Sequence, residues 1–147
     1  AENFYKQALK DDSENRVLAA QRNLQQTVDL LMDVDKLLAS HPLYRLEEWV
    51  ELARNSGTTL QEKDAYEANA KRLITSWGGI QEDYAARFWS GLIKDYYIPR
   101  IQLYFTKGRN KIREWEEQWI TSPWSNSTTP FDDPVEAALS LIEKTNK

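Results

Sequence analysis

The sequence predicts an all-α fold, a helical bundle of five to six helices, and two observations support this. Apolar residues recur at intervals of three and four along most of the 147 residues, which places them on one face of an α-helix. No segment alternates polar and apolar residues for long enough to form a strand. Because a chain of this length can bury one core, we expect residues 1–147 to form a single domain.

The first long helix is predicted to begin near Ser13. Its apolar face consists of Leu24, Val28, Leu31, Val34 and Leu38. Ser40 and Pro42 are expected to cap and open the next segment, which reads as a shorter helix closed by Gly57.

A third helix is predicted to open at Thr59, because Glu62 three residues later completes the capping-box pattern. Its apolar stripe is Tyr66, Ala70, Leu73 and Trp77. After Gly78 and Gly79 we expect a central helix from about Tyr84 to Leu103, apolar over a wide arc. Pro99 has no backbone donor and should kink or divide that helix.

The C-terminal third predicts two further helices. The first carries Ile112, Trp115 and Trp119 on one side. A loop rich in Ser and Thr follows, and Asp133 with Pro134 is expected to cap a last helix that ends near Lys144.

Composition excludes several classes of function. With 19 basic and 23 acidic residues the net charge is −4, so we expect no nucleic-acid partner and no anionic membrane partner. No apolar run approaches the roughly 18 residues of a membrane span, so no membrane insertion is expected. The chain has no cysteine and a single histidine, which argues against a metal site or a Ser-His-Asp site. Because the chain begins with alanine, we expect it to be a piece of a longer protein.

The carboxylates do not form a catalytic pair. They occur as neighbours, for example Asp11–Asp12 and Glu116–Glu117, and adjacent residues on a helix do not face each other. His41, between Ser40 and Pro42, is interpreted as a turn residue. We therefore predict no catalytic residue within this chain.

Most aromatic residues are predicted to lie in the core, because they follow helical spacing. Trp77 is the exception, since it ends a stripe just before two glycines, where a side chain can leave the core. A tryptophan in such a place can stack on the apolar face of a sugar ring. Arg100 follows the break at Pro99 and could donate a bidentate fork outside the bundle or pair internally with an acid.

The segment LLASHPLYRLEEWVELARNSGTTLQEKDAYEANAKRLITSWGG, followed by DYAARFWSGLIKDYYIPR, resembles the C-terminal helical domain of glycoside hydrolase family 89, the α-N-acetylglucosaminidases. The resemblance covers about residues 37–104. Its elements include Trp77–Gly78, Asp83–Tyr84–Ala85 and Tyr96–Tyr97 with Pro99–Arg100. Two features depart from the family pattern: a shorter loop before Asp83, and Ile101 where an aromatic residue often follows.

The resemblance implies an accessory domain of an exo-acting, retaining α-N-acetylglucosaminidase that releases terminal α-linked N-acetylglucosamine (GlcNAc). In this family the two catalytic glutamates lie on a preceding (β/α)8 barrel, which is absent here, so the isolated chain is expected to be inactive. The helical domain is expected to pack on that barrel and to help wall the substrate cleft. No cofactor is implied. The parent enzyme is expected to be periplasmic, secreted or lysosomal.

By the same resemblance, five residues are candidates for the cleft or the barrel interface: Trp77, Asp83, Tyr84, Tyr97 and Arg100. Trp77 would stack on sugar, Asp83 and Tyr84 would hydrogen-bond sugar hydroxyls or barrel loops, and Arg100 would pair with an acid. Two alternatives remain open, a stand-alone helical interaction module and an independent carbohydrate-binding module. The accessory domain, separated from its barrel, would show a large exposed apolar patch and could dimerise through it. The interaction module would hold a partner helix in a groove between helices, and the carbohydrate-binding module would retain affinity for N-acetylglucosamine.

Overall fold

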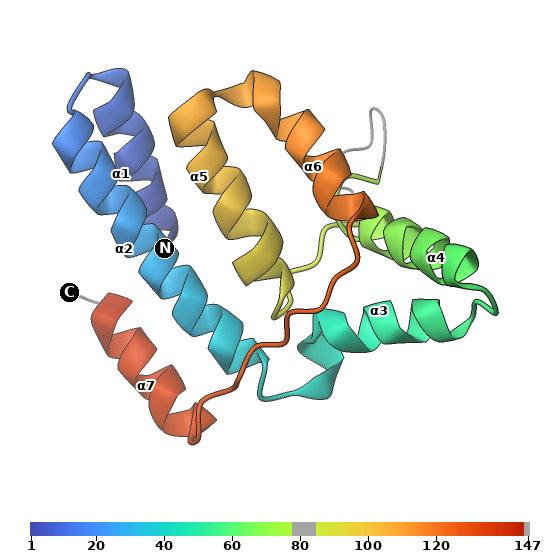
Figure 1. Cartoon of the computed structure of the whole chain (residues 1–147). Helices are drawn as coiled ribbons and strands as arrows, with labels where there is room; N and C mark the ends of the chain where they lie inside the picture. Colours follow the sequence, from blue (N-terminus) through green and yellow to red (C-terminus); the bar gives the residue numbers. More distant parts are fainter. Residues whose placement is uncertain (78–84, 146–147) are drawn as a thin grey trace.

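The computed structural model describes residues 1–77 and 85–145, and this part of the chain is all-α, as predicted (Figure 1). It contains seven α-helices, slightly more than the five to six expected, together with two short 3-10 turns and one π-helical turn. The elements are α1 (Glu2–Ser13), α2 (Val17–Leu38), η1 (Pro42–Tyr44), α3 (Leu46–Asn55), α4 (Leu60–Leu73), η3 (Ile93–Tyr97), α5 (Ile98–Lys107), η4 (Arg109–Lys111), α6 (Ile112–Thr121) and α7 (Pro134–Thr145).

The helices α1 and α2 form a hairpin at the N-terminus (Figure 1). The predicted start near Ser13 was wrong, because α1 ends there and α2 begins at Val17. Asn15 turns the chain with φ 57, a conformation that Asn tolerates better than most residues. The buried carboxylate of Asp11 accepts hydrogen bonds from the Arg16 side chain and fixes this turn. The predicted apolar face of α2 is confirmed, since its members lie in or against one core cluster.

The helices α3 and α4 form a second hairpin, and its caps differ in part from those predicted. His41 caps the η1 turn in place of Ser40, because its Nδ1 accepts a hydrogen bond from the Leu43 backbone at 3.3 Å. The capping box of Thr59 and Glu62 is confirmed at the start of α4. The predicted inward stripe of α4 was wrong at Tyr66, which is 45% exposed, whereas charged residues of α4 are buried.

The central helix begins later than predicted, at Leu92 and not near Tyr84. The chain before it is tied to the start of α3, since Ser90 donates to the Tyr44 carbonyl at 2.8 Å and accepts from the Leu46 N–H at 2.9 Å. These bonds hold the preceding residues in a non-helical path. The irregularity expected at Pro99 takes the form of a π turn, η3, directly before α5, in which Ile98 N–H reaches back to the Ile93 carbonyl.

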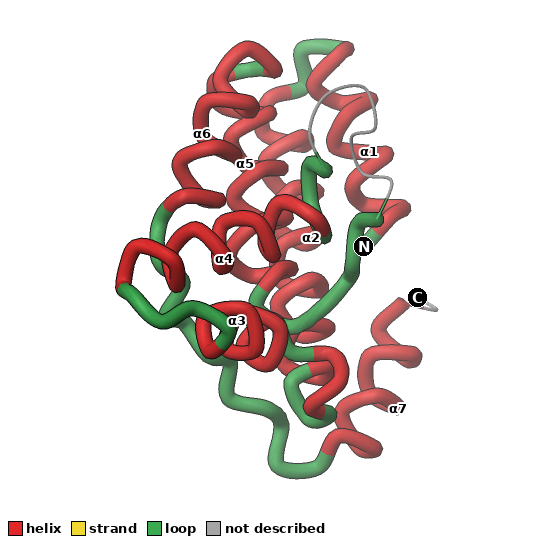
Figure 2. The backbone as a smooth tube through the Cα atoms, turned by 90° about the vertical axis from the view of Figure 1, so that its right-hand side faces the viewer, coloured by secondary structure: helices red, strands yellow, loops and turns green. Residues whose placement is uncertain are grey.

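The helices α6 and α7 are joined by a segment without helical structure, residues 122–133, which crosses the molecule (Figures 1 and 2). The side chain of Asp133 accepts from the backbone N–H groups of Val135 and Glu136, which confirms the predicted cap of α7. The segment brings α7 back to pack on α2. No helix in the described part of the chain is both long and apolar enough to span a bilayer.

Two buried clusters form the core. The larger one joins α3, the end of α4 and the central helix, and consists of Leu46, Val50, Ile74, Leu92 and Tyr96. Tryptophans from several elements pack around it. The smaller one lies between α2 and the central helix and consists of Val28, Leu31, Ile93 and Ile98. Tyr97 packs against both clusters and therefore links them.

Candidate functional site

The segments on either side of residues 78–84 meet at one backbone hydrogen bond. The N–H of Arg87 donates to the carbonyl of Ile74 at 3.2 Å, and Ile74 is itself buried in the larger cluster. Just outside this bond, Trp77 is 37% exposed and Phe88 is 52% exposed. Two large exposed rings thus lie on either side of residues 78–84 in the sequence. We call Trp77, Phe88 and Tyr97 the aromatic edge.

Trp77 has a backbone conformation that is uncommon for a bulky residue. Its φ is 50°, and its N–H donates to the Arg72 carbonyl at 2.8 Å. The left-handed conformation costs a non-glycine residue roughly 1–2 kcal/mol. Strain of this kind concentrates at binding and catalytic sites, where the surrounding structure holds it in place. The conformation of Trp77 is therefore an independent reason to consider this edge functional.

Tyr97 holds the loop against the central helix. Its hydroxyl donates to the Arg87 carbonyl at 2.9 Å, and its ring centroid lies 5.9 Å from that of Phe88. Phe88 was missed as a candidate, because helical spacing assigned it to the core. Since the helix begins only at Leu92, Phe88 lies in non-helical chain and is exposed.

Asp83 and Tyr84, the two other candidates between Trp77 and Phe88 in the sequence, lie outside the described residues. Their proposed hydrogen bonds to sugar or to barrel loops therefore remain predictions.

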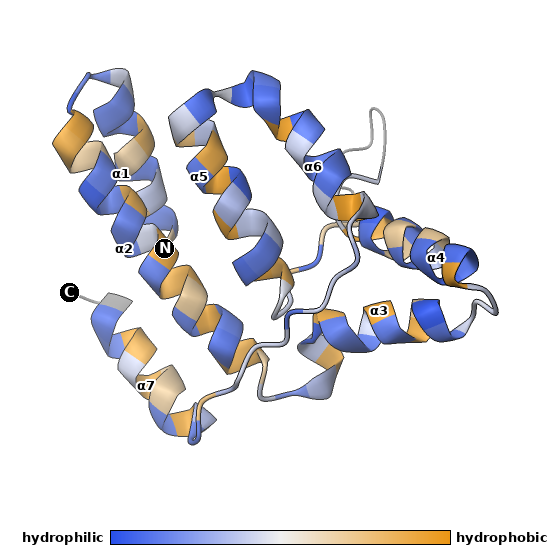
Figure 3. Cartoon of the chain, in the orientation of Figure 1, coloured by the Kyte–Doolittle hydropathy of each residue, from blue (hydrophilic) through white to orange (hydrophobic). Residues whose placement is uncertain are grey.

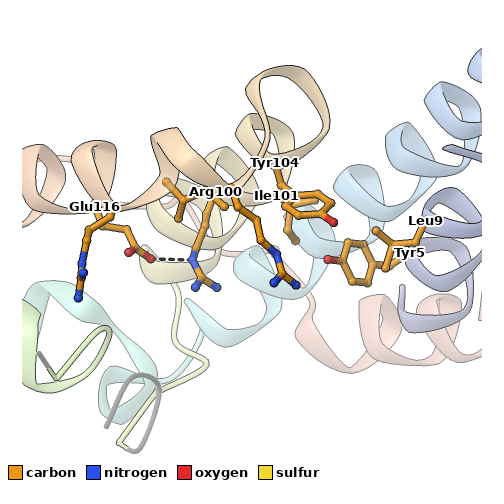
Figure 4. A pocket seen from close by; sticks show the side chains of 9 residues that line it. Tyr5, Leu9, Arg100, Ile101, Tyr104 and Glu116 are labelled. Carbon is orange, nitrogen blue, oxygen red and sulfur yellow. Dashed lines mark hydrogen bonds and ion pairs between the residues drawn. The ribbon is translucent and has the colours of Figure 1, made fainter. Parts of the chain in front are cut away.

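Arg100 lies about one turn beyond Tyr97 in the central helix and pairs with a residue of α6. Its Nε donates to Oε1 of Glu116 at 2.7 Å, and the hydroxyl of the buried Tyr96 donates to the same oxygen at 2.7 Å. Of the two roles considered for Arg100, an internal ion pair is the one that the structure contains. Figure 4 shows this pair beside a groove that α1 and α5 also line.

A buried ion pair in α4 was not predicted. The side chains of Lys71 and Glu67 are 1% and 2% exposed, and Nζ lies 3.1 Å from Oε1. Lys71 also donates to the carbonyls of Trp119 and Ser122, which ties the end of α6 to α4. Burial lowers the pKa of Lys71, and the charge of Glu67 opposes that shift. The spacing of four residues was visible in the sequence, but such pairs usually lie on the surface.

Asp35 of α2 caps the central helix from outside it. The residue is fully buried and accepts hydrogen bonds from the N–H of Gly91 at 2.8 Å and of Lys94 at 3.1 Å. The hydroxyls of Ser90 and Thr128 donate to its second oxygen at 3.2 and 2.6 Å. Sequence spacing offers no signal for this cap, because its donors are more than fifty residues away.

The buried carboxylates stabilise the fold through their hydrogen bonds, and this limits the reactions in which they could take part. Asp11, Asp35 and Glu67 are each held by several donors from neighbouring segments. Within the described ranges, no group of three or more His, Asp or Glu residues is placed to hold a metal ion. The edge offers ring faces, a form of surface that binds apolar faces of ligands such as sugars.

The fold and the aromatic edge together define a class of protein: an all-α domain that exposes aromatic rings on either side of residues 78–84. Comparison with known proteins identifies the family within that class. The sequence profile described as "Alpha-N-acetylglucosaminidase (NAGLU) C-terminal domain" matches residues 1–144. The chain therefore belongs to the family of α-N-acetylglucosaminidase C-terminal domains.

Relatives with names and solved structures are much longer than this chain. Human alpha-N-acetylglucosaminidase is 38% identical over 78 residues, which is 52% of this chain and 10% of the human protein. A family 89 glycoside hydrolase from Clostridium perfringens, solved with PUGNAc, has a TM-score of 0.80 at 20% identity and matches 97% of this chain and 19% of its own. The same bacterial enzyme with GlcNAc-alpha-1,4-galactose, named as its substrate, gives a TM-score of 0.77 at 22% identity, with the same coverage. These structural matches show a shared fold.

Proposed function

We propose that this chain is the C-terminal accessory domain of an exo-acting, retaining α-N-acetylglucosaminidase that releases terminal α-linked N-acetylglucosamine from glycans. The observation that carries the proposal is the family match over residues 1–144 in a chain that spans about a tenth to a fifth of its relatives. The catalytic pair would lie on a (β/α)8 barrel elsewhere in the polypeptide, with its carboxyl groups about 5 Å apart, as retention requires. This domain would pack on that barrel.

The aromatic edge is the part that we assign to the substrate cleft. Trp77 offers an exposed ring in a strained conformation, and Phe88 lies on the other side of residues 78–84 in the sequence. Stacking of such rings on a sugar would position the terminal residue for attack without taking part in bond cleavage. Asp83 and Tyr84, between them in the sequence, would supply hydrogen bonds to sugar hydroxyls.

The test uses the parent enzyme with a chromogenic α-N-acetylglucosaminide. Trp77→Ala and Phe88→Ala are each expected to lower kcat/KM about tenfold or more, in line with the loss of 1–3 kcal/mol of ring contact. Leu52→Ala is the matched control, since Leu52 is 66% exposed on α3. Unchanged kcat/KM and melting temperature in both variants would show that the aromatic edge is not part of the substrate cleft.

The 147-residue chain itself is proposed to be inactive, because the catalytic glutamates would lie on the barrel, outside this chain. Incubation of the purified chain with the same chromogenic substrate should give no turnover above buffer. Turnover that survives repeated purification would contradict the accessory role. A periplasmic, secreted or lysosomal parent remains part of this proposal, and localisation of the full-length protein tests it.

A second candidate function, a helical interaction module, is favoured by one observation. The helix α7 exposes three aliphatic residues at positions one turn apart, Val135, Leu139 and Ile142, which are 68%, 59% and 56% exposed. Figure 3 shows hydrophobic colouring along most of this helix. If the isolated chain dimerises through this stripe, sedimentation should show a dimer that Leu139→Glu converts to monomer. A monomer at all concentrations would count against that function.

A further inference from the structure

A cavity of about 210 Å³, distinct from the groove beside Arg100, lies where the segment that follows α6 passes the central helix. Figure 1 shows this segment leaving α6 and running past the start of α5. The volume equals that of about seven molecules of liquid water and is smaller than the roughly 300–1,000 Å³ of a drug-sized site. The cavity can therefore take one small ring and not a longer chain.

The lining of this cavity combines aromatic and polar side chains. Trp119, Trp124 and two prolines form its apolar part, whereas Asp95, Asn126 and two serines form most of its polar part. Both tryptophans are only half-buried, so part of each side chain is accessible. A few polar groups set among aromatic rings are typical of a ligand site.

Hydrogen bonds bring the polar and aromatic side chains together. Nε1 of Trp124 donates to Oδ2 of Asp95 at 3.0 Å, and the Asn126 side chain hydrogen-bonds to the same carboxylate. On the other side of the cavity, Nζ of Lys71 donates to the Trp119 carbonyl at 3.0 Å. The positions of the lining residues are therefore fixed by contacts between α4, α6, the central helix and the segment after α6.

Asp95 is the residue of this cavity that is best suited to hold a ligand. It lies in the π turn η3, and π turns within helices are frequent at functional sites. Its hydrogen-bond donors in the cavity, an indole and an amide, are both neutral, and a carboxylate can accept about four hydrogen bonds. Burial raises the pKa of Asp95, because these donors and the charge of Lys94 only partly offset the loss of water. A further donor from a ligand would therefore stabilise its carboxylate.

The charges around the cavity favour a neutral ligand. An anion would meet the carboxylate of Asp95. A cation would meet Lys71, whose Nζ already lies 4.9 Å from the centroid of the Trp119 ring. The ammonium of Lys71 is itself committed to Glu67 and to two backbone carbonyls. A sugar ring fits this environment, since its hydroxyls donate hydrogen bonds and its C–H face packs on an aromatic ring.

We infer that this cavity is a sugar subsite separate from the aromatic edge, in which Asp95 and Asn126 bind the hydroxyls of one neutral sugar ring and Trp124 packs on its apolar face. Asp95 and Tyr97 are two positions apart in the central helix, so their side chains face different directions. Binding of a hydroxylated ring follows from the cavity itself, whereas a glycan as the source of that ring rests on the proposed function.

The test titrates the 147-residue chain with sugars and follows the indole N–H signals in NMR spectra, assigned through single Trp→Phe variants. The probes are N-acetylglucosamine, galactose and sorbitol, an open-chain polyol without a ring face. At least one of the two sugars should give saturable shifts of the Trp119 and Trp124 signals, and sorbitol should give none. No saturation with either sugar, equal shifts with sorbitol, or shifts at Trp77 in place of Trp124 would overturn the inference.

Variants test whether Asp95 and Asn126 hold the sugar. Asp95→Asn removes the charge but keeps an acceptor for Trp124, and it should weaken binding about tenfold or more. Asn126→Ala, on the exposed non-helical segment, should weaken binding without touching a helix. Asp132→Asn is the matched control, because it removes the same charge from an exposed position outside the cavity.

Full affinity in the Asp95 and Asn126 variants, or an equal loss in the Asp132 variant, would exclude these residues as the sugar site. Failure here is distinct from failure at the aromatic edge, because the cavity is tested by binding to the isolated chain and the edge by hydrolysis in the parent enzyme.

Discussion

Two regions of this molecule invert the usual distribution of polar and apolar side chains. In the first, which we call the polar junction, Asp35, Glu67 and Lys71 are buried beside the segment that leads from α6 to α7. In the second, the aromatic edge, Trp77 and Phe88 are exposed. The comparison shows that the available hydrogen-bond partners, and not polarity alone, determine which side chains are buried here. Each charged group in the junction has several such partners.

The two regions also differ in what they contribute to the isolated domain. The junction joins α2, α4 and the central helix through bonds that only the folded chain can make. The edge leaves apolar area exposed and keeps Trp77 in a strained conformation. Stability therefore explains the junction, whereas for the edge we propose a binding role. Three substitutions test this contrast, and a fourth, at the exposed cap of α4, sets its lower limit; they follow from the largest expected effect to the smallest.

Asp35→Ala should give the largest loss, about 4 kcal/mol in the free energy of unfolding, because several buried donors lose their acceptor at once. Urea denaturation of the isolated chain measures it. Asp33→Ala is the matched control on the same helix, since Asp33 is partly exposed and is paired only with the exposed Lys144 at 3.3 Å among the ion pairs described, so its loss should cost under about 1 kcal/mol. Equal losses in the two variants would show that the junction does not carry the stability assigned to it.

Lys71→Met should destabilise the chain by about 3 kcal/mol, because it leaves Glu67 buried with less compensating charge. Adding Glu67→Gln should recover part of this loss, so the double variant should be more stable than the sum of the single variants predicts. Lys63→Met on the same helix is the control and should change stability little. Strict additivity in the double-mutant cycle would contradict a coupled pair.

Trp77→Gly should be about 1 kcal/mol more stable than Trp77→Ala in the isolated chain, because glycine adopts φ 50 without strain. In the parent enzyme both variants should lose activity alike. This result would separate the stability of the edge from its function. If the alanine variant is as stable as the glycine variant, the strain at Trp77 is not present in solution.

Glu62→Gln should have the smallest effect and one that depends on pH. Hydrogen bonds from the Thr58 side chain first, and then from the backbone N–H groups of Thr59 and Thr58, lower the pKa of the exposed Glu62 carboxyl from 4.5 to about 2. A lowered pKa adds stability that is fully present above 4.5 and is lost as pH falls through about 2. The melting temperatures of wild type and variant should therefore differ at pH 7 and converge near pH 2, with Glu51→Gln as control. A difference that does not depend on pH would exclude the carboxylate as the cause.

Local sequence signals predicted much of the fold. The stripe of α2, the capping box at Thr59 and the cap at Asp133 all depend on residues within a few positions of each other, so spacing alone reveals them. The start of the central helix was wrong for the opposite reason. Its cap is supplied by Asp35, and the preceding chain is held by Tyr44, both far away in sequence.

The candidate site was predictable to a smaller extent. The position of Trp77 before two glycines indicated that its ring could leave the core, whereas Phe88 shares the spacing of core residues and gave no such sign. The cavity around Asp95 could not be predicted, because its lining residues come from α4, the central helix and the chain around the end of α6. The spacing of residues in the sequence predicts which residues are neighbours on one helix, but it does not predict which residues of different helices are in contact.

The π turn at Ile93–Tyr97 gives the chain a tolerance to a change of length that no substitution tests. A π turn holds one residue more than an α turn, so it absorbs a one-residue insertion within the helix. Deleting a residue there would restore a regular α-helix and leave the helix beyond it nearly in place, whereas the same deletion in a regular α turn would rotate that helix by about 100°. Arg100 and Tyr104 would then keep their places beside the groove. Relatives that lack the extra residue could build the same wall from equivalent residues, so an alignment of such proteins should show a one-residue gap here.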